Sequence, residues 1–249
     1  MNVAAIRTAK VEPSAPPSII DFLDVHIPKL TEGSVVAIAS KVVAICEGRV
    51  APIEGNDKDE LIKKETALYL PRESNPFHVT LSVTHNLLVA AGGIDESNSG
   101  DYYVLWPKDK QASANAIRGH LAQKHNLTNV GVVITDSTTR PFQWGTTGLG
   151  IAHSGFKALK NYIGTQDIFG RQLQFQQNNI MNGLAAAAVL LMGEGNEQQP
   201  LAIISDVPFV EFVPHNPTQQ ELDLLSISIE EDIYQPLLQN VPWLKGDQQ

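Results

Sequence analysis

The chain has 249 residues, 43% of them hydrophobic, which is enough for one large domain or two small interleaved ones with a real core. Its 18 basic and 27 acidic residues give a net charge of −9, which argues against binding nucleic acid through the phosphate backbone. An acidic protein that binds an anionic ligand needs metal ions or a local basic pocket. Cys46 is the only cysteine, so an internal disulfide and a zinc site of clustered cysteines are excluded.

Targeting signals are not evident in the sequence. The N-terminal residues lack the apolar core of a signal peptide, and the longest apolar stretch, 184–192, is too short to cross a bilayer. With a single cysteine, these features predict a cytoplasmic protein with no membrane partner. We interpret Cys46 as a buried thiol that acts as a small apolar residue rather than as a nucleophile.

The first half of the chain mixes strand and helix patterns between turn residues. In chain order, the patterns predict an early strand and loop over 1–18, a short helix at 19–23, a strand at 35–43, a charged helix at 57–69, a hairpin over 80–91 and a strand at 102–106.

The second half continues in the same mixed way. Its patterns predict a helix at 113–125, a strand at 130–134, an irregular glycine-rich segment at 142–160, a helix at 178–192 ended by Gly193, a strand at 201–204 and a helix at 219–238. Strands and helices do not alternate regularly, and there is no GxGxxG or phosphate-loop motif. An α+β fold is therefore predicted.

Two acidic clusters follow apolar runs, each where a predicted strand enters a loop. Asp95 lies in the first cluster, at 93–98, and Asp136 and Ser137 lie in the second, at 134–141. Hard divalent cations such as Mg²⁺ and Mn²⁺ take oxygen ligands of this kind. An Asp at the end of a strand is, by itself, more often part of a turn or a helix cap, so these clusters alone do not establish a metal site.

Seven short motifs, in order between about residues 31 and 206, resemble the family of coenzyme F420-0:γ-glutamyl ligases. They are Ser40-Lys41 with Glu47-Gly48-Arg49, AGGIDESN at 91–98, ASA at 112–114, ITDS at 134–137 with Arg140-Pro141, DIFGR at 167–171, LAAA at 184–187 and MGE at 192–194. Any one of these motifs is weak, but their shared order makes a chance resemblance improbable.

The resemblance implies an α+β fold of two intertwined lobes with mixed, largely antiparallel sheets. Residues 1–249 would form a single γ-glutamyl ligase-like domain that assembles as a homodimer. The implied activity is that of a metal- and nucleotide-dependent amide ligase, which adds L-glutamate to coenzyme F420-0 or a related anionic carboxylate through an acyl phosphate. GTP is the expected nucleotide, and two Mn²⁺ or Mg²⁺ ions are expected, with K⁺ as a helper.

Metal ligands follow from the resemblance position by position. Asp95 and Asp136 would hold the first ion, and Ser137 and Glu194 would bind the second.

The resemblance also implies a nucleotide site and catalytic cations. Lys41 and Arg140 are the expected catalytic residues, because both can spread transition-state charge. The implied nucleotide contacts are Ser40, Lys41, Asn98, Met192, Gly193 and Glu194.

Two departures from the family pattern concern positive charge. Ile45 stands where many members carry a second lysine, and Ile163 stands where an arginine is common. Both changes predict weaker binding of an anionic ligand, and therefore slow glutamylation of F420-0 or a preference for a less anionic carboxylate.

Several residues have a plain structural interpretation beside a functional one. Arg49 could form an ion pair with Glu47 or contact a ligand. His85 and His153 have no second histidine at ligand spacing. The segment 167–171 is either a tight turn or a substrate-side loop.

Two alternative functions remain open on the sequence. One is a non-catalytic nucleotide- or deazaflavin-binding protein on the same scaffold. The other is a γ-glutamyl ligase for a folate-like acceptor.

Overall fold

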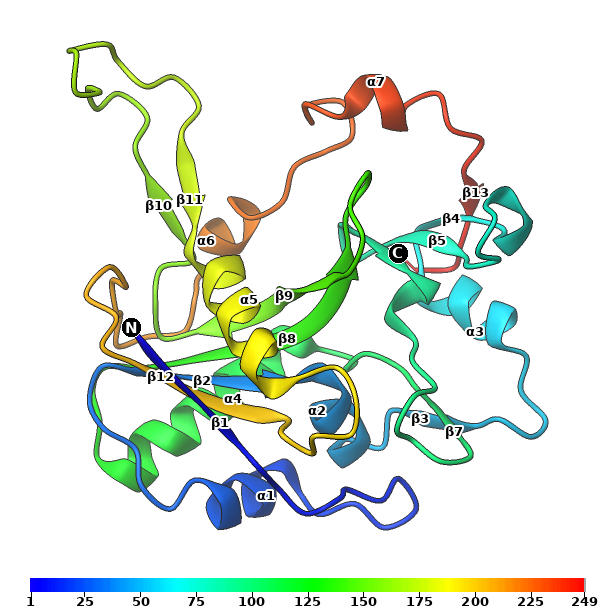
Figure 1. Cartoon of the computed structure of the whole chain (residues 1–249), viewed down its shortest axis with the longest axis horizontal. Coiled ribbons are helices and arrows are strands. Elements are labelled where there is room, and N and C mark those ends of the chain that lie inside the picture. The colour runs from blue at the N-terminus through cyan, green and yellow to red at the C-terminus, as the bar shows by residue number, and fades with distance from the viewer. Residues whose placement is uncertain (249) are drawn as a thin grey trace.

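The computed structural model describes residues 1–248, and a five-stranded sheet forms its centre (Figure 1). The strands are β1 (Asn2–Ile6), β2 (Ser34–Ala39), β8 (Val130–Thr139), β9 (Thr146–Ser154) and β12 (Leu201–Ser205). Their order across the sheet is β1-β12-β2-β8-β9. β2 and β8 run parallel, and the other neighbouring strands are antiparallel.

Helices cover both faces of this sheet, so its central strands are apolar on both sides. The helices are α1 (Ile19–His26), α2 (Ser40–Cys46), α4 (Lys110–His125) and α5 (Ile180–Met192). Val36 and Ile38 of β2 pack in the core formed with α1 and α4, whereas Val35 and Ala37 pack against α5. Alternate residues of a strand point to opposite faces, which explains the unbroken apolar run of β2.

A smaller sheet lies beside the central one (Figure 1). Its order is β13-β4-β5-β6, with β4 (Leu68–Leu70), β5 (Leu81–Thr84), β6 (Leu87–Ala90) and β13 (Leu244–Lys245). Nearby elements are β3 (Val50–Pro52), α3 (Lys58–Glu65), the 3₁₀ turns η1 (Arg72–Ser74) and η2 (Ala91–Gly93), and β7 (Tyr102–Val104), which pairs with β3.

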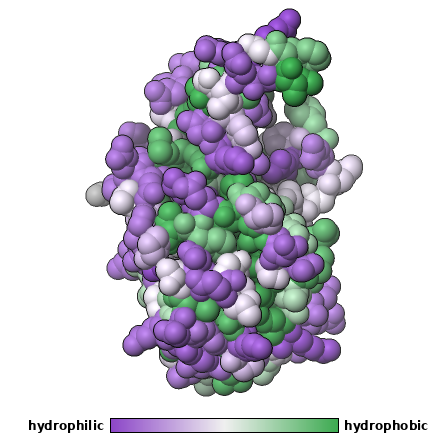
Figure 2. Space-filling view, turned by 90° about the vertical axis from the view of Figure 1, so that its left-hand side faces the viewer, coloured by the Kyte–Doolittle hydropathy of each residue, from purple (hydrophilic) through white to green (hydrophobic). Residues whose placement is uncertain are grey.

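A two-stranded arm projects from the body of the molecule (Figure 1). It consists of β10 (Leu159–Asn161) and β11 (Gln177–Asn179) with the long connection between them. Figure 2 shows apolar residues gathered near the top of the face on which this arm lies. The C-terminal part of the chain carries two short helices, α6 (Gln219–Asp223) and α7 (Gln235–Leu238).

The α+β class and the mixed, largely antiparallel sheets are confirmed. So are the early strand, the first helix, the hairpin over 80–91, the helices that became α4 and α5, and the strand β12. No helix within residues 1–248 is both long and apolar enough to span a membrane.

Four predicted elements need correction. The strand at 35–43 ends at Ala39, where α2 begins, because its second half packs as a helix between the sheet and β7. The charged helix at 57–69 ends at Glu65, and 68–70 instead pair as β4. The predicted helix at 219–238 is two short helices, since Pro236 cannot lie inside a longer one.

The segment 142–160 was predicted to be irregular, but most of it forms β9 and β10. The segment was predicted to be irregular because it is rich in glycine. A Cβ at Gly148 would overlap the backbone of Ala185, and one at Gly150 would overlap the side chain of Met181. These glycines therefore allow α5 to lie close on the strand, which is a role of glycine inside sheets.

Candidate functional site

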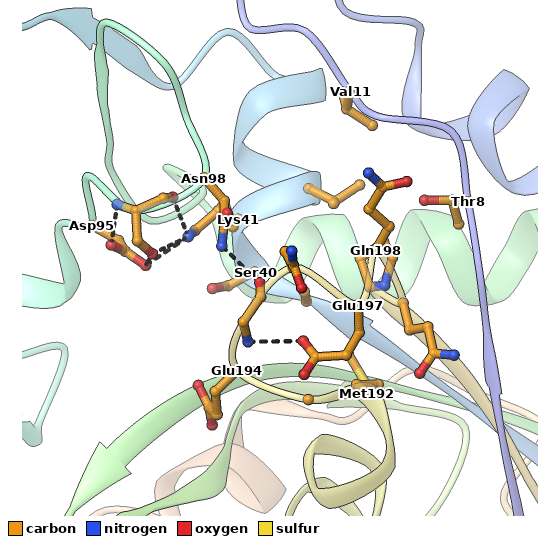
Figure 3. Close-up of a pocket in the computed structure, with 18 of the residues that line it drawn as sticks. Thr8, Val11, Ser40, Lys41, Asp95, Asn98, Met192, Glu194, Glu197 and Gln198 are labelled. Atoms are coloured by element: carbon orange, nitrogen blue, oxygen red, sulfur yellow. Dashed lines mark hydrogen bonds and ion pairs between the residues drawn. The ribbon is translucent and has the colours of Figure 1, made fainter.

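A cavity of about 480 Å³ opens at the carboxyl ends of β2 and β8 (Figure 3). Because these strands are parallel and their pairing ends at Ala39 and Thr135, the residues that come next along each chain segment lie side by side. Ser40 and Lys41 come from the start of α2, and Asp136 and Ser137 from β8. The remaining walls are formed by 8–11, by the loop at 95–100 and by the segment at 192–200.

Lys41 and Asp95 form an ion pair on one wall. The Lys41 Nζ lies 2.7 Å from Asp95 Oδ2 and also donates to the carbonyl oxygen of Ser97 at 2.6 Å. The Ser97 backbone N–H donates to Asp95 Oδ1 at 2.7 Å. Burial alone would raise the pKa of Asp95, but the hydrogen bonds from Lys41 and Ser97 outweigh it and hold that pKa below its usual range. Asp95 is therefore ionised at neutral pH.

Asp136 has a different environment. The indole N–H of Trp106 donates to its Oδ2, and the backbone N–H of Ser137 donates to Oδ1 at 2.8 Å. The pKa of Asp136 is raised to about 6, mainly by burial and in smaller part by the charge of Asp95, while these two hydrogen bonds act in the opposite direction. The two carboxylates are thus close enough to repel each other, a repulsion that a bound cation would relieve.

Glu194 faces Ser137 across the cavity. Its Oε1 accepts from the Ser137 hydroxyl at 2.7 Å and from the Thr146 hydroxyl at 3.1 Å. Gly193, which ends α5, has φ of 82°, a conformation that suits glycine, and this places Glu194 at the rim. The turn after it is tied to the opposite wall, because the Asn98 side-chain amide donates to the carbonyl oxygen of Gly195 at 2.9 Å.

The structure brings nearly all the predicted site residues together. Those lining the cavity are Ser40, Lys41, Asp95, Asn98, Asp136, Ser137, Met192, Gly193 and Glu194. Arg140 is the exception, since it is exposed in the turn between β8 and β9 and does not line the cavity. The catalytic role expected of Arg140 therefore stays a prediction: β8 continues to Thr139, which carries Arg140 away from Asp136 along the strand.

Other expectations are resolved by their contacts. Arg49 pairs with Glu65 at 2.6 Å, not with Glu47, which accepts a hydrogen bond from Ser113. Cys46 is partly buried, and burial raises the pKa of its thiol to about 11, so it is not an activated nucleophile.

The remaining candidates lie outside the cavity. His153 is buried in β9 against Phe156. His85 stacks on Trp106, with ring centroids 6.3 Å apart. The segment 167–171 is a tight turn on the arm, where Asp167 Oδ1 accepts from the backbone N–H of Phe169 at 2.8 Å.

Three parts of the site were missed in the sequence. Trp106 was taken as the end of a strand, and neither Thr146 nor the segment 8–11 was assigned to a site. Residues 8–11 follow a strand at the sheet edge and carry no motif. Nothing local to Trp106 indicates that its indole reaches a carboxylate 30 residues further on.

Four oxygen-bearing side chains that line the cavity could hold a divalent cation. Within residues 1–248, no three His, Cys, Asp or Glu side chains are gathered as a ready-made metal cage. The oxygen donors come instead as the repelling pair Asp95 and Asp136, with the Ser137 hydroxyl and Glu194 beside them. A Mg²⁺ ion that bridges a nucleotide keeps several of its water ligands. It is typically bound by one or two protein carboxylates together with the phosphates. The residues present therefore fit such an ion.

The fold and cavity define an α+β protein whose candidate site gathers carboxylates and a lysine at the ends of two parallel strands. The chain belongs to the F420-0:γ-glutamyl ligase family, whose sequence profile matches residues 17–206.

Individual relatives agree with the family match. The chain is 35% identical over 202 residues to the coenzyme F420:L-glutamate ligase of Methanococcus maripaludis strain C7, covering 75% of this chain and 79% of that protein. It is 31% identical over 202 residues to the protein of that name from Methanocaldococcus jannaschii, covering 72% and 79%. It is 32% identical over 194 residues to the one from Archaeoglobus fulgidus, covering 71% and 76%.

Proposed function

We propose that the protein is a metal- and nucleotide-dependent amide ligase that adds L-glutamate to coenzyme F420-0 or a related carboxylate. GTP is the proposed nucleotide, two Mn²⁺ or Mg²⁺ ions the proposed cofactors, and K⁺ a proposed helper. The observation that carries this proposal is the meeting of Lys41, Asp95, Asp136 and the Ser137–Glu194 pair in one cavity of a family member.

Amide formation from a free carboxylate is uphill, so the carboxylate must first be activated. An oxygen of the acceptor carboxylate would attack the γ-phosphorus of GTP, forming an acyl phosphate and releasing GDP. The amine of glutamate would then attack the acyl carbon, and inorganic phosphate and a proton would leave. Such phosphoryl transfer depends mainly on positioning and on neutralising charge.

The residues of the chain divide these tasks. Asp95, Asp136, Ser137 and Glu194 would hold the divalent ions, which neutralise phosphate charge when bound. Lys41 would exchange its contact with Asp95 for a phosphate oxygen, because an ammonium group is a strong donor to phosphate. Asn98 ties the segment after α5 to the opposite wall, which keeps the nucleotide cavity in one shape.

The alternative functions differ in one measurable respect. The chain would be incubated with Mn²⁺ or Mg²⁺, K⁺, GTP or ATP, glutamate, and either F420-0 or a folate-like acceptor, and phosphate release would be followed. We expect release only when a suitable acceptor is present, and none from the Asp136→Asn variant, which removes the carboxylate charge and keeps only one of the two acceptor oxygens that bind the Trp106 and Ser137 N–H groups. Binding of nucleotide without phosphate release for any acceptor would support a non-catalytic binding protein instead.

A homodimer forms part of the proposal. Large apolar side chains are exposed to solvent on the β10–β11 arm and at the tip of the β8–β9 hairpin. A second copy of the chain is the proposed partner that covers them.

A further inference from the structure

Trp106 contacts both acidic segments of the candidate site. Its indole N–H donates to Asp136 Oδ2, and its ring lies directly on Gly93, two residues before Asp95. Any Cβ at Gly93 would overlap the indole, so the close contact requires glycine at this position. Trp106 is only 3% exposed, which makes it an internal support rather than a ligand-contacting surface.

The short segment that carries Trp106 also holds the backbone of Asp95. The Asp95 N–H donates to the carbonyl oxygen of Val104 at 3.0 Å, and the Val104 N–H donates back to the carbonyl oxygen of Asp95 at 2.8 Å. Residues 104–106 thus fix the main chain of one carboxylate and the side chain of the other. The spacing between Asp95 and Asp136 therefore depends on this segment.

The indole is itself restrained on several sides. Arg49 Nε donates to the Trp106 carbonyl oxygen at 3.0 Å, and Arg49 is held by its ion pair with Glu65. The His85 ring stacks on the indole at an interplanar angle of 22°, and the Lys110 Nζ lies 5.9 Å from the indole centroid. A side chain held in this way can position a ligating group, because its own conformation is fixed.

The hydrogen bond from Trp106 does not block cation binding at Asp136. An ionised carboxylate offers about four lone-pair positions, and the Trp106 and Ser137 N–H groups occupy one on each oxygen. The other positions remain for a metal ion. Partners that hydrogen-bond to a ligating group from behind orient it and tune its affinity.

We propose that Trp106 is a positioning residue that fixes the Asp136 carboxylate relative to Asp95 for binding a divalent cation. The proposal rests on the metal site of the proposed function. It gives a role to a buried indole that none of the family motifs contains.

The first test is the Trp106→Phe variant, which removes the N–H donor and keeps an aromatic ring. Calorimetric titration with Mn²⁺ should show about tenfold weaker binding than in the native chain. In the proposed reaction kcat should fall while the KM for glutamate is unchanged, and excess Mn²⁺ should restore kcat. A merely structural defect would not be rescued by metal. The matched control is Trp243→Phe, which removes an indole N–H that donates to the Leu238 carbonyl oxygen at 3.0 Å, outside the cavity.

A second measurement keeps Trp106 in place. In the Trp144→Phe/Trp243→Phe chain, Trp106 is the only tryptophan, so its fluorescence reports on its surroundings. Paramagnetic Mn²⁺ should quench this emission, and Asp136→Asn in the same background should abolish the quenching. Bound Mn²⁺ that leaves the emission unchanged would overturn the proposal, as would quenching that survives Asp136→Asn.

The outcomes separate the proposal from the function on which it rests. Equal Mn²⁺ affinity in native and Trp106→Phe chains would overturn the positioning role and leave the proposed ligase intact. A native chain that binds no Mn²⁺ would overturn both.

Discussion

Lys41 is the residue whose side chain joins the start of α2 to the first acidic cluster. Its Nζ contacts Asp95 and both the carbonyl and the hydroxyl oxygen of Ser97, the latter at 3.0 Å. We expect Lys41→Met to lower kcat by about a hundredfold or more, because a preorganised cation beside a transferring phosphate is lost. The melting temperature should change little, since ion pairs of this exposure contribute about 0–1 kcal/mol. Steady-state kinetics and thermal unfolding of the same samples check both statements.

The matched control is Lys157→Met. This variant removes the ammonium group of a surface ion pair in which Lys157 Nζ lies 2.5 Å from Glu211 Oε1. This pair lies away from the cavity, so activity should be unchanged. Equal losses of activity in the two variants would show that Lys41 acts through general charge rather than at the site.

His153 is a buried residue with an unusual pH dependence. It is 2% exposed, its Nδ1 has no hydrogen-bond partner among residues 1–248, and burial lowers its pKa to about 4, although Glu221 acts in the opposite direction. The unfolded chain, with a histidine pKa near 6.5, takes up this proton more readily than the folded one. The folded state therefore loses stability as the pH falls from about 6.5 to about 4, by up to about 3 kcal/mol.

His153→Leu should flatten this part of the stability curve. The variant fills the same space without a titrating group, so its loss of unfolding free energy between pH 7 and pH 4 should be smaller than that of the native chain. Urea unfolding at a series of pH values measures the difference. Parallel curves for the two proteins would show that His153 does not contribute.

At the scale of elements, helix α2 carries both Lys41 and Ile45, one turn apart on the same face. Ile45 lines the cavity and is only 3% exposed, packed with Ala44 and Val104. This places the departure from the family pattern at the candidate site. We expect Ile45→Lys to tighten GTP binding about tenfold, because a second ammonium group could reach a phosphate.

The same substitution should cost stability. A lysine stem can follow the apolar wall toward the cavity, but the lost packing of Ile45 should lower the melting temperature. Calorimetric titration with GTP and Mn²⁺ measures the affinity, and Ile45→Met, similar in volume and uncharged, is the control. Equal GTP affinity in native, Met and Lys proteins would show that the departure is neutral.

Elements whose pattern was local could be predicted from the sequence. The hairpin over 80–91 and the helices α4 and α5 carry their own periodicity and end signals, such as Gly193. The acidic clusters at Asp95 and Asp136 were identified because each follows an apolar run, and the other cavity residues were expected from the resemblance to the ligase family. These features depend on short stretches of chain.

Features that depend on distant contacts could not be predicted. Gly148 and Gly150 belong to a strand only because α5 lies against them, and the apolar run at 35–43 changes from strand to helix at Ala39 through packing. The bond from Trp106 to Asp136 joins two segments whose spacing is set by the fold. Arg140 matched a motif, yet the length of β8 decides where it lies.

At the scale of the whole molecule, two projections expose apolar side chains. Phe142 and Trp144 lie at the tip of the β8–β9 hairpin, and Ile168, Phe169 and Phe175 lie on the arm, each at least 85% exposed. Large exposed patches of this kind mark interaction sites in soluble proteins. A partner that covered both projections would bury a large apolar surface.

We therefore expect a homodimer with an interface beyond about 2,000 Å² in total, in the range of permanent assemblies. Sedimentation at micromolar concentration should give twice the 27.1 kDa mass of the chain. Ile168→Glu/Phe169→Glu should shift the equilibrium toward monomer, because two charges would be buried without partners. Val25→Glu is the control, since Val25 is 73% exposed on α1 and lies on neither projection. A native chain that sediments as a monomer would contradict the expected dimer, and a dimer unaffected by the arm variant would move the interface away from the arm.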